Sequence, residues 1–524
     1  MAKWHALMEY VQFPLKILFA ATLMLGVGNA LINPNIAYLW EIDNEIIIMI
    51  CEMLRYSGGF LIKLFPLLVF LVVLNRKFED SAPVFIGFVS YMIISLVVLF
   101  LENSDAASYF YDNLLGIRIS FDSSSIFNEA VRIPYNTGIF SLLAAYGITM
   151  YSYLKSRHYT MHGLLSFIDH DAWAMILCAV FSILCGIVFA YGWPLVIHII
   201  NYFYEFLASD LLNPMNLFLY GISERLSAVF GLQDIQRNAF WLSELGGSAT
   251  DNFGVLYQGD VNTWYAYQNL HIVTANTGYL ITPYYVINLF VIPGFLLGYF
   301  SLVHSGKDKR RYLPFFVLAL ALSILSGNPF PMEVLMLILA PMLYVCYLFT
   351  VGFLYAGCEM LGAAIGFWFK GSLNATTGTL MIANPGSFMD LLPSFRNPDL
   401  QYSLSIVIAL GIVALVVFFF ATRLYFSRFA IGLFQFRNVH EISERVIDAL
   451  GSLENIRAVT STPDKLTIAL NQRDKVNFEQ LREEGAYLIL ESKEGYLIRL
   501  GNLSTIIAKD IKKRLKKKQK QADA

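Results

Sequence analysis

The sequence predicts a polytopic α-helical membrane protein that ends in a small α/β domain, and three observations carry this prediction. Hydrophobic residues make up 57% of the 524 residues and charged residues only 15%, which is too apolar for a soluble protein of this size. Apolar stretches of membrane-spanning length recur up to about residue 430. From about residue 437 the composition becomes that of an ordinary globular domain. The net charge of −2 indicates little about partners, because the charges are densest after Arg423.

Nine or ten transmembrane helices are expected in residues 1–430, the predicted membrane domain. A helix needs roughly 20 apolar residues to cross about 30 Å of hydrocarbon. Stretches near or above that length cover 12–31, 59–74, 82–102, 137–154, 173–200, 280–303, 312–326, 333–357 and 403–425. We interpret the first as a transmembrane helix and not a signal peptide, because it has no convincing cleavage site and many spans follow it.

Basic residues in short loops predict the orientation of these helices, because Lys and Arg are retained on the cytoplasmic side. The strongest clusters are Lys155 with Arg157, residues 307–311, and Arg423 with Arg428. These loops are therefore expected in the cytoplasm, and so is the C-terminal domain.

The cysteines predict neither a disulfide framework nor a metal site. All five lie in apolar segments, where thiolates form poorly, and they are Cys51, Cys178, Cys185, Cys346 and Cys358. The chain has no C-x-x-C spacing, no phosphate-binding loop and no G-x-S-x-G elbow. We therefore expect packing thiols, no metal and no cofactor.

The C-terminal domain, residues 438–512, shows the periodicity of an αββαββα unit. Apolar residues at helical spacing predict a helix over 439–450 that stops at Gly451, and alternation predicts a strand with Leu466, Ile468 and Leu470 on one face. The other expected elements are strands at 455–460, 486–491 and 495–500, a helix at 477–484 and a long helix from about 502. The basic tail, 513–524, is interpreted as a solvated helix end or as a segment attracted to anionic membrane lipid. Nucleic acid is not an expected partner.

The C-terminal domain resembles the IIB domain of glucose-superfamily permeases of the sugar phosphotransferase system. Residues 450–456, Leu-Gly-Ser-Leu-Glu-Asn-Ile, are similar to the family's L-G-G-x-x-N-I, which precedes a phosphocysteine loop of the form D-A-C-x-T-R-L-R. Residues 475–477, 481–486 and 495–501 resemble the later motifs K-V-D, L-K-x-x-G-A and G-x-Q-V-I-F-G. The resemblance therefore covers nearly the whole domain.

The membrane part resembles the IIC domain of the same family, with its motifs in the family's order. Residues 326–333, Ser-Gly-Asn-Pro-Phe-Pro-Met-Glu, are similar to T-G-I-T-E-P-I-E, and residues 340–345, Ala-Pro-Met-Leu-Tyr-Val, are similar to A-P-x-L-Y-V. Weaker matches are 25–28, 220–225, 230–232 and 259–260.

This resemblance implies a fold, a place and partners. It implies a IIC-type helical domain of about ten transmembrane helices that binds a saccharide near the membrane midplane, moves it by an elevator-like displacement and forms a homodimer. It implies the cytoplasmic (inner) membrane of a bacterium. A cytoplasmic phosphocarrier or regulatory partner of the phosphotransferase system is expected as well.

The sequence departs from the family at the groups that carry its chemistry. Thr462 stands at the phosphocysteine position, and only Lys465 remains of the two basic residues beside it. A threonine hydroxyl is a poor nucleophile near neutral pH and its phosphate ester is a poor donor, so self-contained phosphorylation is not expected.

The expected saccharide site is also altered. Phe330 replaces the family's first glutamate, and Gln233 with Asp234 replaces its histidines. Gln233 and Asp234 can still hydrogen-bond sugar hydroxyls and Phe330 can stack on an apolar sugar face, so all three stay candidate sugar ligands. The other candidates are Arg225, Asn328 and Glu333, since polar groups in an apolar stretch normally face a cavity or a partner. A structural ion pair of Arg225 with Glu224 or Asp234 is the plain alternative, as is a structural role for Glu333.

Three functions follow from this pattern. The first is a permease that binds and transports a saccharide without phosphorylating it. The second is a sugar sensor that does not transport. The third is a phosphotransferase that receives its phosphoryl group from a separate IIB protein.

Overall fold

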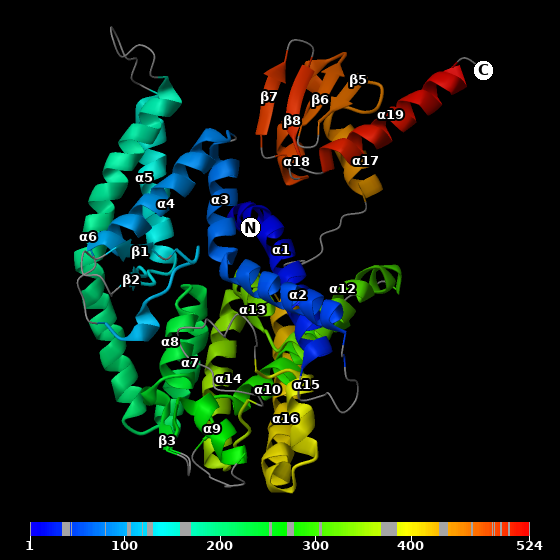
Figure 1. Ribbon diagram of the computed structural model, residues 1–524. Helices are drawn as coiled ribbons and strands as arrows, with labels where there is room; N and C mark the ends of the chain where they lie inside the picture. The colour runs from blue at the N-terminus through cyan, green and yellow to red at the C-terminus, as the bar shows by residue number, and fades with distance from the viewer. Residues whose placement is uncertain are drawn as a thin grey trace. The chain divides into compact units, whose positions relative to one another are not determined.

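The protein is described by a computed structural model in which two compact units divide at Ala430 and Ile431 (Figure 1). The described residues are 2–33, 42, 44–78, 80–101, 106–117, 119–122, 129–157, 169–250, 254–269, 277–302, 306–367, 385–428, 439–462, 465–484, 486, 488–492, 495–500 and 503–522. We refer to the two units as the membrane unit and the C-terminal unit.

The membrane unit is built almost entirely from helices. The first half contains α1 (Ala2–Ile32), α2 (Glu45–Lys63), α3 (Phe65–Phe78), α4 (Ala82–Leu101), η2 (Ser108–Phe110), β1 (Ile119–Asp122), β2 (Glu129–Arg132), α5 (Ile139–Ser156) and α6 (His170–Ala208). Next come α7 (Pro214–Val229), α8 (Gln233–Trp241), η4 (Glu244–Gly246), β3 (Ser248–Thr250), β4 (Leu256–Gln258), α9 (Asp260–Asn269), α10 (Thr282–Val286), the π-helical turn η5 (Ile287–Val291) and α11 (Ile292–Ser301). The last elements are α12 (Gly306–Ser326), α13 (Phe330–Leu339), α14 (Pro341–Met360), α15 (Phe388–Leu391), η8 (Leu392–Phe395), η9 (Pro398–Leu400) and α16 (Gln401–Arg428).

The described helices confirm the fold class of a polytopic helical membrane protein, with fewer full spans than the sequence predicts. Six helices are long and apolar enough to cross a membrane, or seven if α2 and α3, bent by 54°, form one broken span. The predicted stretches 137–154 and 312–326 do not give candidate spans, and 333–357 gives one only from Pro341 onward, after the short helix α13. Helix α13 has ten residues and a length of about 15 Å, half of the hydrocarbon thickness.

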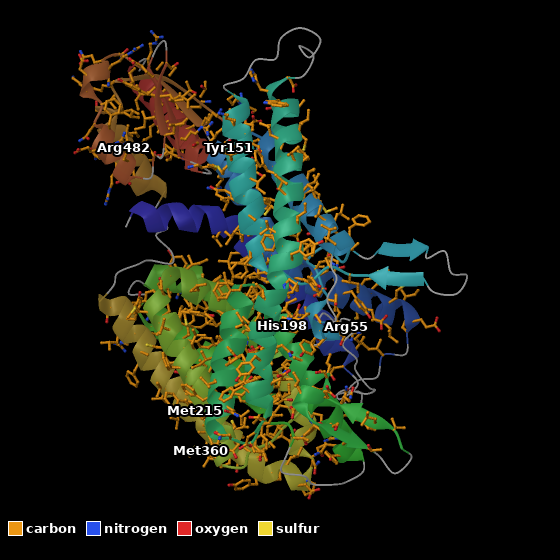
Figure 2. The ribbon with its side chains drawn as sticks, turned by 90° about the vertical axis from the view of Figure 1, so that its left-hand side faces the viewer. Arg55, Tyr151, His198, Met215, Met360 and Arg482 are labelled. Atoms are coloured by element: carbon orange, nitrogen blue, oxygen red, sulfur yellow. The ribbon has the colours of Figure 1, made fainter. Side chains whose placement is uncertain are left out.

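Several helices of the membrane unit pack directly against one another. Helices α4, α5 and α6 pack on one another, and α7 packs along α14 (Figure 1). Figure 2 shows Met215 and Met360, on α7 and α14, toward one end of the unit, and Tyr151 of α5 toward the other.

The pair α1 and α2 depends on a glycine. A Cβ atom on Gly58 would lie 2.5 Å from the carbonyl oxygen of Ala21 and 2.6 Å from the amide nitrogen of Leu25. Small residues permit this kind of approach between membrane helices. By contrast, a Cβ atom on Gly147 of α5 would meet no atom within 4 Å.

The C-terminal unit has the αββαββα order that the periodicity predicts. Its elements are α17 (Val439–Ala449), β5 (Ile456–Ser461), β6 (Lys465–Leu470), η10 (Arg473–Lys475), α18 (Phe478–Glu483), β7 (Leu488–Ser492), β8 (Gly495–Arg499) and α19 (Leu503–Ala522). The four strands form one antiparallel sheet in the order β5-β6-β8-β7. The basic tail predicted from residue 513 is helical through Ala522.

The core of this unit confirms the predicted face of β6. Leu466, Ile468 and Leu470 are buried, and they pack with α17 residues such as Val446 and with Ile507 of α19. Leu490 of β7 is 49% exposed and lies outside this core. Alternation with period two therefore sets which side of the sheet the helices cover.

Candidate functional site

A cluster of four buried charged residues lies inside the membrane unit. Glu224 and Arg225 come from α7, Arg237 from α8 and Glu333 from α13, and none of them is more than 7% exposed. The Arg237 Nε donates to Glu224 Oε1 at 2.7 Å, and the Arg225 Nη1 donates to Glu333 Oε1 at 3.1 Å. The Arg225 Nε lies 2.8 Å from Glu224 Oε2. Two carboxylates and two guanidinium groups give this cluster, which we call the charge cluster, a formal charge of zero.

Aromatic side chains surround the charge cluster. The Tyr284 hydroxyl donates to Glu224 Oε1 at 2.5 Å, and the Tyr347 hydroxyl donates to Glu333 Oε1. The Arg225 guanidinium lies 4.2 Å from the centre of the Tyr284 ring, a cation–π contact. Arg237 lies 5.2 Å from the Trp241 ring. These contacts replace much of the water that the four charges lose on burial.

The turn between α7 and α8 brings Arg237 back to Glu224. Gly231 adopts a positive φ of 68°, a conformation that favours glycine, and the amide of Leu232 donates to the carbonyl of Ser227 at 2.9 Å. This tight C-terminal cap reverses the chain after one helix. As a result, the short helix α8 packs against α7, and Arg237 lies on its buried side.

Several polar atoms at the charge cluster and beside it have no hydrogen-bond partner among the described residues. They include the Nη2 of Arg225, the Oε2 of Glu333 and the Nδ2 of Asn328, and all three are buried. Buried polar atoms are nearly always paired, so unpaired ones indicate a place where a ligand or water binds. A molecule that carries both donors and acceptors fits this set.

The structure brings together only some of the candidate sugar ligands. Arg225 forms an ion pair with Glu224, which is one of the two structural partners considered for it, and a second ion pair with Glu333. Asp234, the other partner considered, is not in either pair. Asn328 lies just before α13, where its Oδ1 accepts from the amide of Phe330 at 3.2 Å. Gln233 occupies the first turn of α8.

Asp234 also lies in the first turn of α8, and both it and Gln233 are partly exposed. The ion pairs of the charge cluster involve neither residue. Arg237, which follows them on the same helix, enters the cluster instead. The sequence therefore indicates the correct helix but not the correct residue on it.

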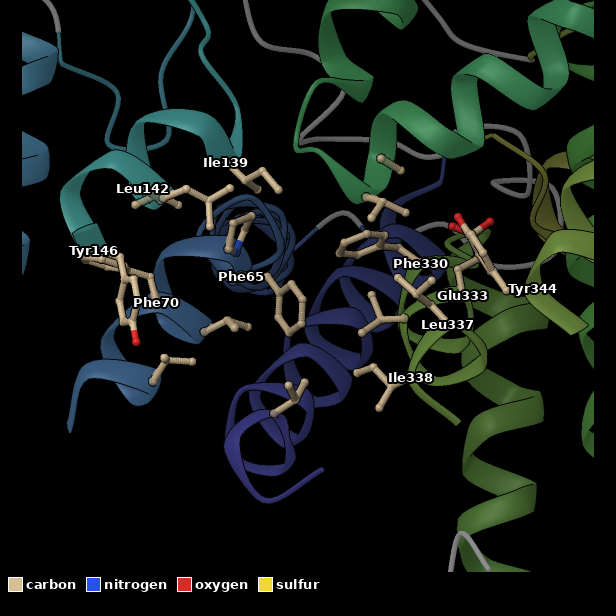
Figure 3. A pocket seen from close by; sticks show the side chains of 18 residues that line it. Phe65, Phe70, Ile139, Leu142, Tyr146, Phe330, Glu333, Leu337, Ile338 and Tyr344 are labelled. Carbon is tan, nitrogen blue, oxygen red and sulfur yellow. The ribbon is translucent and has the colours of Figure 1, made fainter. Parts of the chain in front are cut away.

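Phe330 faces an apolar environment. Its ring packs edge-on against Phe65 of α3, with centroids 5.7 Å apart and an interplanar angle of 90°. Both residues line a cavity of about 500 Å³ (Figure 3), and its residues are Val11, Phe65, Pro66, Val69, Phe70, Val73, Ile139, Leu142, Leu143, Tyr146, Ala228, Val229, Phe330, Glu333, Val334, Leu337, Ile338 and Tyr344. Figure 3 shows Glu333 and Tyr344 together at one end and Tyr146 at the other. We call this space the apolar cavity.

Sequence reasoning missed three members of the site, Arg237, Tyr284 and Tyr347. The available signal for Arg237 was its spacing of four residues from Trp241, which puts a cation and an aromatic ring on one helix face. The two tyrosines had no local signal. They enter the cluster from α10 and α14, and only the packing of those helices shows it.

A further buried acid, Asp260, lies outside the candidate spans. Its Oδ1 accepts from the amide of Gly278 at 2.7 Å, across a segment of 18 residues. Burial raises the pKa of this carboxyl to about 7, although backbone amides of Gly278 and Leu280 oppose the shift.

Thr462, which stands at the phosphocysteine position of the resemblance, directly follows β5. The Thr462 amide donates to the carbonyl of Lys465 at 2.8 Å, and the Lys465 amide lies 3.2 Å from the Thr462 hydroxyl oxygen, which accepts from it. Thr462 is exposed, so a protein could reach it. Its hydroxyl still has the weak nucleophilicity that the sequence predicts.

Among the described residues, no group of three or more His, Cys, Asp and Glu side chains could hold a metal ion. The chain was compared with models of known protein families, and no family model matches it.

Proposed function

We propose that the protein is a membrane permease that binds and transports a saccharide, and that it does not phosphorylate this saccharide by itself. The observation that carries the proposal is the charge cluster, with its unpaired donor and acceptor atoms. A saccharide hydroxyl donates one hydrogen bond and accepts others, so it can pair with Arg225 Nη2 and Glu333 Oε2 together. The neutral total charge of the cluster favours a neutral solute over an ion.

Broken helices beside the cluster support a role in transport. Helix α13 ends at Leu339, Ala340 lies outside the helical conformation, and α14 begins at Pro341. The chain reaches α13 through the non-helical residues 327–329. Within a membrane domain, irregular backbone is tolerated where it lines a cavity or is buried in protein, and many transporters bind solutes at such breaks.

The absence of phosphorylation is supported by the resemblance and by the turn at Thr462. An exposed threonine takes the place of the thiol, and its hydroxyl oxygen accepts the amide hydrogen of Lys465. A stable phosphate ester on this hydroxyl would be a poor phosphoryl donor. The proposed permease therefore releases an unmodified saccharide or relies on another protein for phosphorylation.

Binding is tested by thermal unfolding of the purified full-length protein in lipid nanodiscs with a panel of hexoses, N-acetylhexosamines and disaccharides. At least one saccharide is expected to raise the unfolding temperature in a saturable way. Glu333→Gln should weaken its affinity roughly tenfold or more, because a charged hydrogen bond contributes about 1.5–3 kcal/mol.

The matched control is Glu205→Gln, because Glu205 is an exposed glutamate of the same unit that accepts from Asn201 at 2.7 Å. This variant should bind like the parent protein. If no saccharide in the panel changes the unfolding temperature, the charge cluster is a structural ion-pair network and the proposal is wrong.

A further inference from the structure

The apolar cavity is a poor place for a saccharide. Aliphatic and aromatic side chains from α1, α3, α5, α7 and α13 form most of its wall, and its polar groups lie at its two ends (Figure 3). A saccharide carries hydroxyls around its whole ring, and most of them would be buried here without partners, which is unfavourable. The cavity therefore requires a ligand that is apolar along most of its length.

Its size matches a single hydrocarbon chain. The volume is about 500 Å³, which at roughly 30 Å³ for each water-sized group corresponds to about 16 such groups, close to one fatty acyl chain. The volume also lies within the range of roughly 300–1,000 Å³ that is typical of small-molecule pockets. Since its walls belong to membrane helices, the surrounding bilayer is a direct source of such chains.

The polar groups at one end of the cavity determine which head group the ligand can carry. Glu333 lines the cavity and is 3% exposed, and its Oε2 has no hydrogen-bond partner among the described residues. A cationic head would be repelled by Arg225, which lies 3.1 Å from the other oxygen of the same carboxyl group. An anionic head would be repelled by Glu333 itself. The complementary head is a neutral hydrogen-bond donor.

We propose that the apolar cavity is a binding site for one neutral lipid alcohol. The hydroxyl donates to Oε2 of Glu333, and the chain lies between Phe65 and Val69 on one side and Val334 on the other. A long-chain alcohol, a monoacylglycerol and a diacylglycerol share this chemistry. The alcohol and the proposed saccharide contact the same oxygen of Glu333, so the two ligands exclude each other at this atom. Labelling is measured without saccharide, so a failure of the lipid site and a failure of the proposed function are distinguishable results.

The test uses photoreactive 1-hexadecanol, with a diazirine in its chain, and the full-length protein in phosphatidylcholine nanodiscs. Labelled peptides are identified by mass spectrometry. Label is expected in α3 and α13, and unlabelled 1-hexadecanol should compete for it. Competition by 1-monooleoylglycerol and by dioleoylglycerol then distinguishes the possible sources of the alcohol.

Changes in the head group test the contact with Glu333. The methyl ether of the same probe has no donor, so it should label α13 roughly tenfold less well than the alcohol. The corresponding carboxylate and trimethylammonium probes should also label less. Equal labelling by alcohol and ether would overturn the assignment of the head group.

Variants that fill the cavity from opposite walls test its location. Val69→Phe and Val334→Phe add bulk from α3 and from α13, and each should lower the labelling roughly tenfold. The control is Val417→Phe on α16, a position that is 51% exposed and outside the cavity, and it should label like the parent protein. Equal labelling of all three variants would overturn the proposal.

Competition by a series of unlabelled 1-alkanols tests the size of the cavity in the parent protein, so this test does not require that any variant folds correctly. Competition should strengthen with each added methylene up to about 16 carbons and then level off, since the cavity is full. The reference is the partition of each alkanol into protein-free nanodiscs. If competition instead rises in parallel with partition into nanodiscs at every chain length and never levels off, no cavity of this size binds the chain.

Discussion

Removing the charge of Glu224 should be among the most damaging single changes in the membrane unit. Glu224 is fully buried and neutralises two guanidinium groups, those of Arg225 and Arg237, at 2.8 Å and 2.7 Å. Glu224→Gln keeps the shape but leaves one buried positive charge uncompensated. Breaking a buried ion pair by removal of one partner costs about 3–5 kcal/mol.

The assay is thermal unfolding of the full-length protein in nanodiscs, followed by intrinsic tryptophan fluorescence. At roughly 2 °C per kcal/mol for a large domain, Glu224→Gln should lower the midpoint by about 6–10 °C. Glu205→Gln, which changes an exposed glutamate, should move it by about 1 °C or less.

A double variant separates charge balance from lost packing. Arg237→Met alone leaves an excess negative charge, whereas Glu224→Gln combined with Arg237→Met is neutral again. The double variant should therefore lose at least about 1 kcal/mol less than the sum of the two single variants. A midpoint for Glu224→Gln within 2 °C of the control, or additive losses in the double variant, would refute a buried and mutually neutralised cluster.

Three further predictions concern other parts of the chain. Gly58→Ala should destabilise the membrane unit by about 1–3 kcal/mol, because its Cβ would meet backbone atoms, whereas Gly147→Ala should be neutral or stabilising in the same unfolding assay. The pKa of Asp260 is raised to about 7 in the folded protein, so the folded state holds the extra proton and stability should fall as the pH rises from about 4 to about 7. Asp260→Asn should remove this dependence, and equal pH profiles of the unfolding midpoint for both proteins would contradict it. Leu466→Ala should cost the C-terminal unit about 2–5 kcal/mol and Leu490→Ala less than about 1 kcal/mol, as measured by hydrogen exchange in the full-length protein, and equal losses would show that the assigned core is wrong.

The C-terminal unit was the most predictable part of the chain, because its signals are local. Alternation of Leu466, Ile468 and Leu470 is enough to define a strand and its buried face, and the stop at Gly451 follows from its positive φ of 86°. The number of full spans was less predictable. Hydropathy does not show that a break at Pro341 divides one apolar stretch into a short helix and a full span.

The site could be predicted only in outline. An acidic residue in an apolar stretch marked Glu333, and its partner Arg225 was also identified, yet the pairing of the two depends on contact across 108 residues. The apolar cavity depends on still longer contacts, since Val11 and Val334 line the same space. Neither composition nor periodicity contains that information.

The most direct test of the central claim is uptake of labelled saccharides into proteoliposomes that contain the full-length protein. We predict saturable uptake of at least one saccharide, weaker uptake by Glu333→Gln than by Glu205→Gln, and recovery of the sugar in unphosphorylated form even when the general phosphotransferase proteins and their phosphoryl donor are present. Absence of uptake for every saccharide that binds would contradict transport and favour a sensor. Formation of sugar phosphate without an added IIB protein would contradict the loss of phosphorylation.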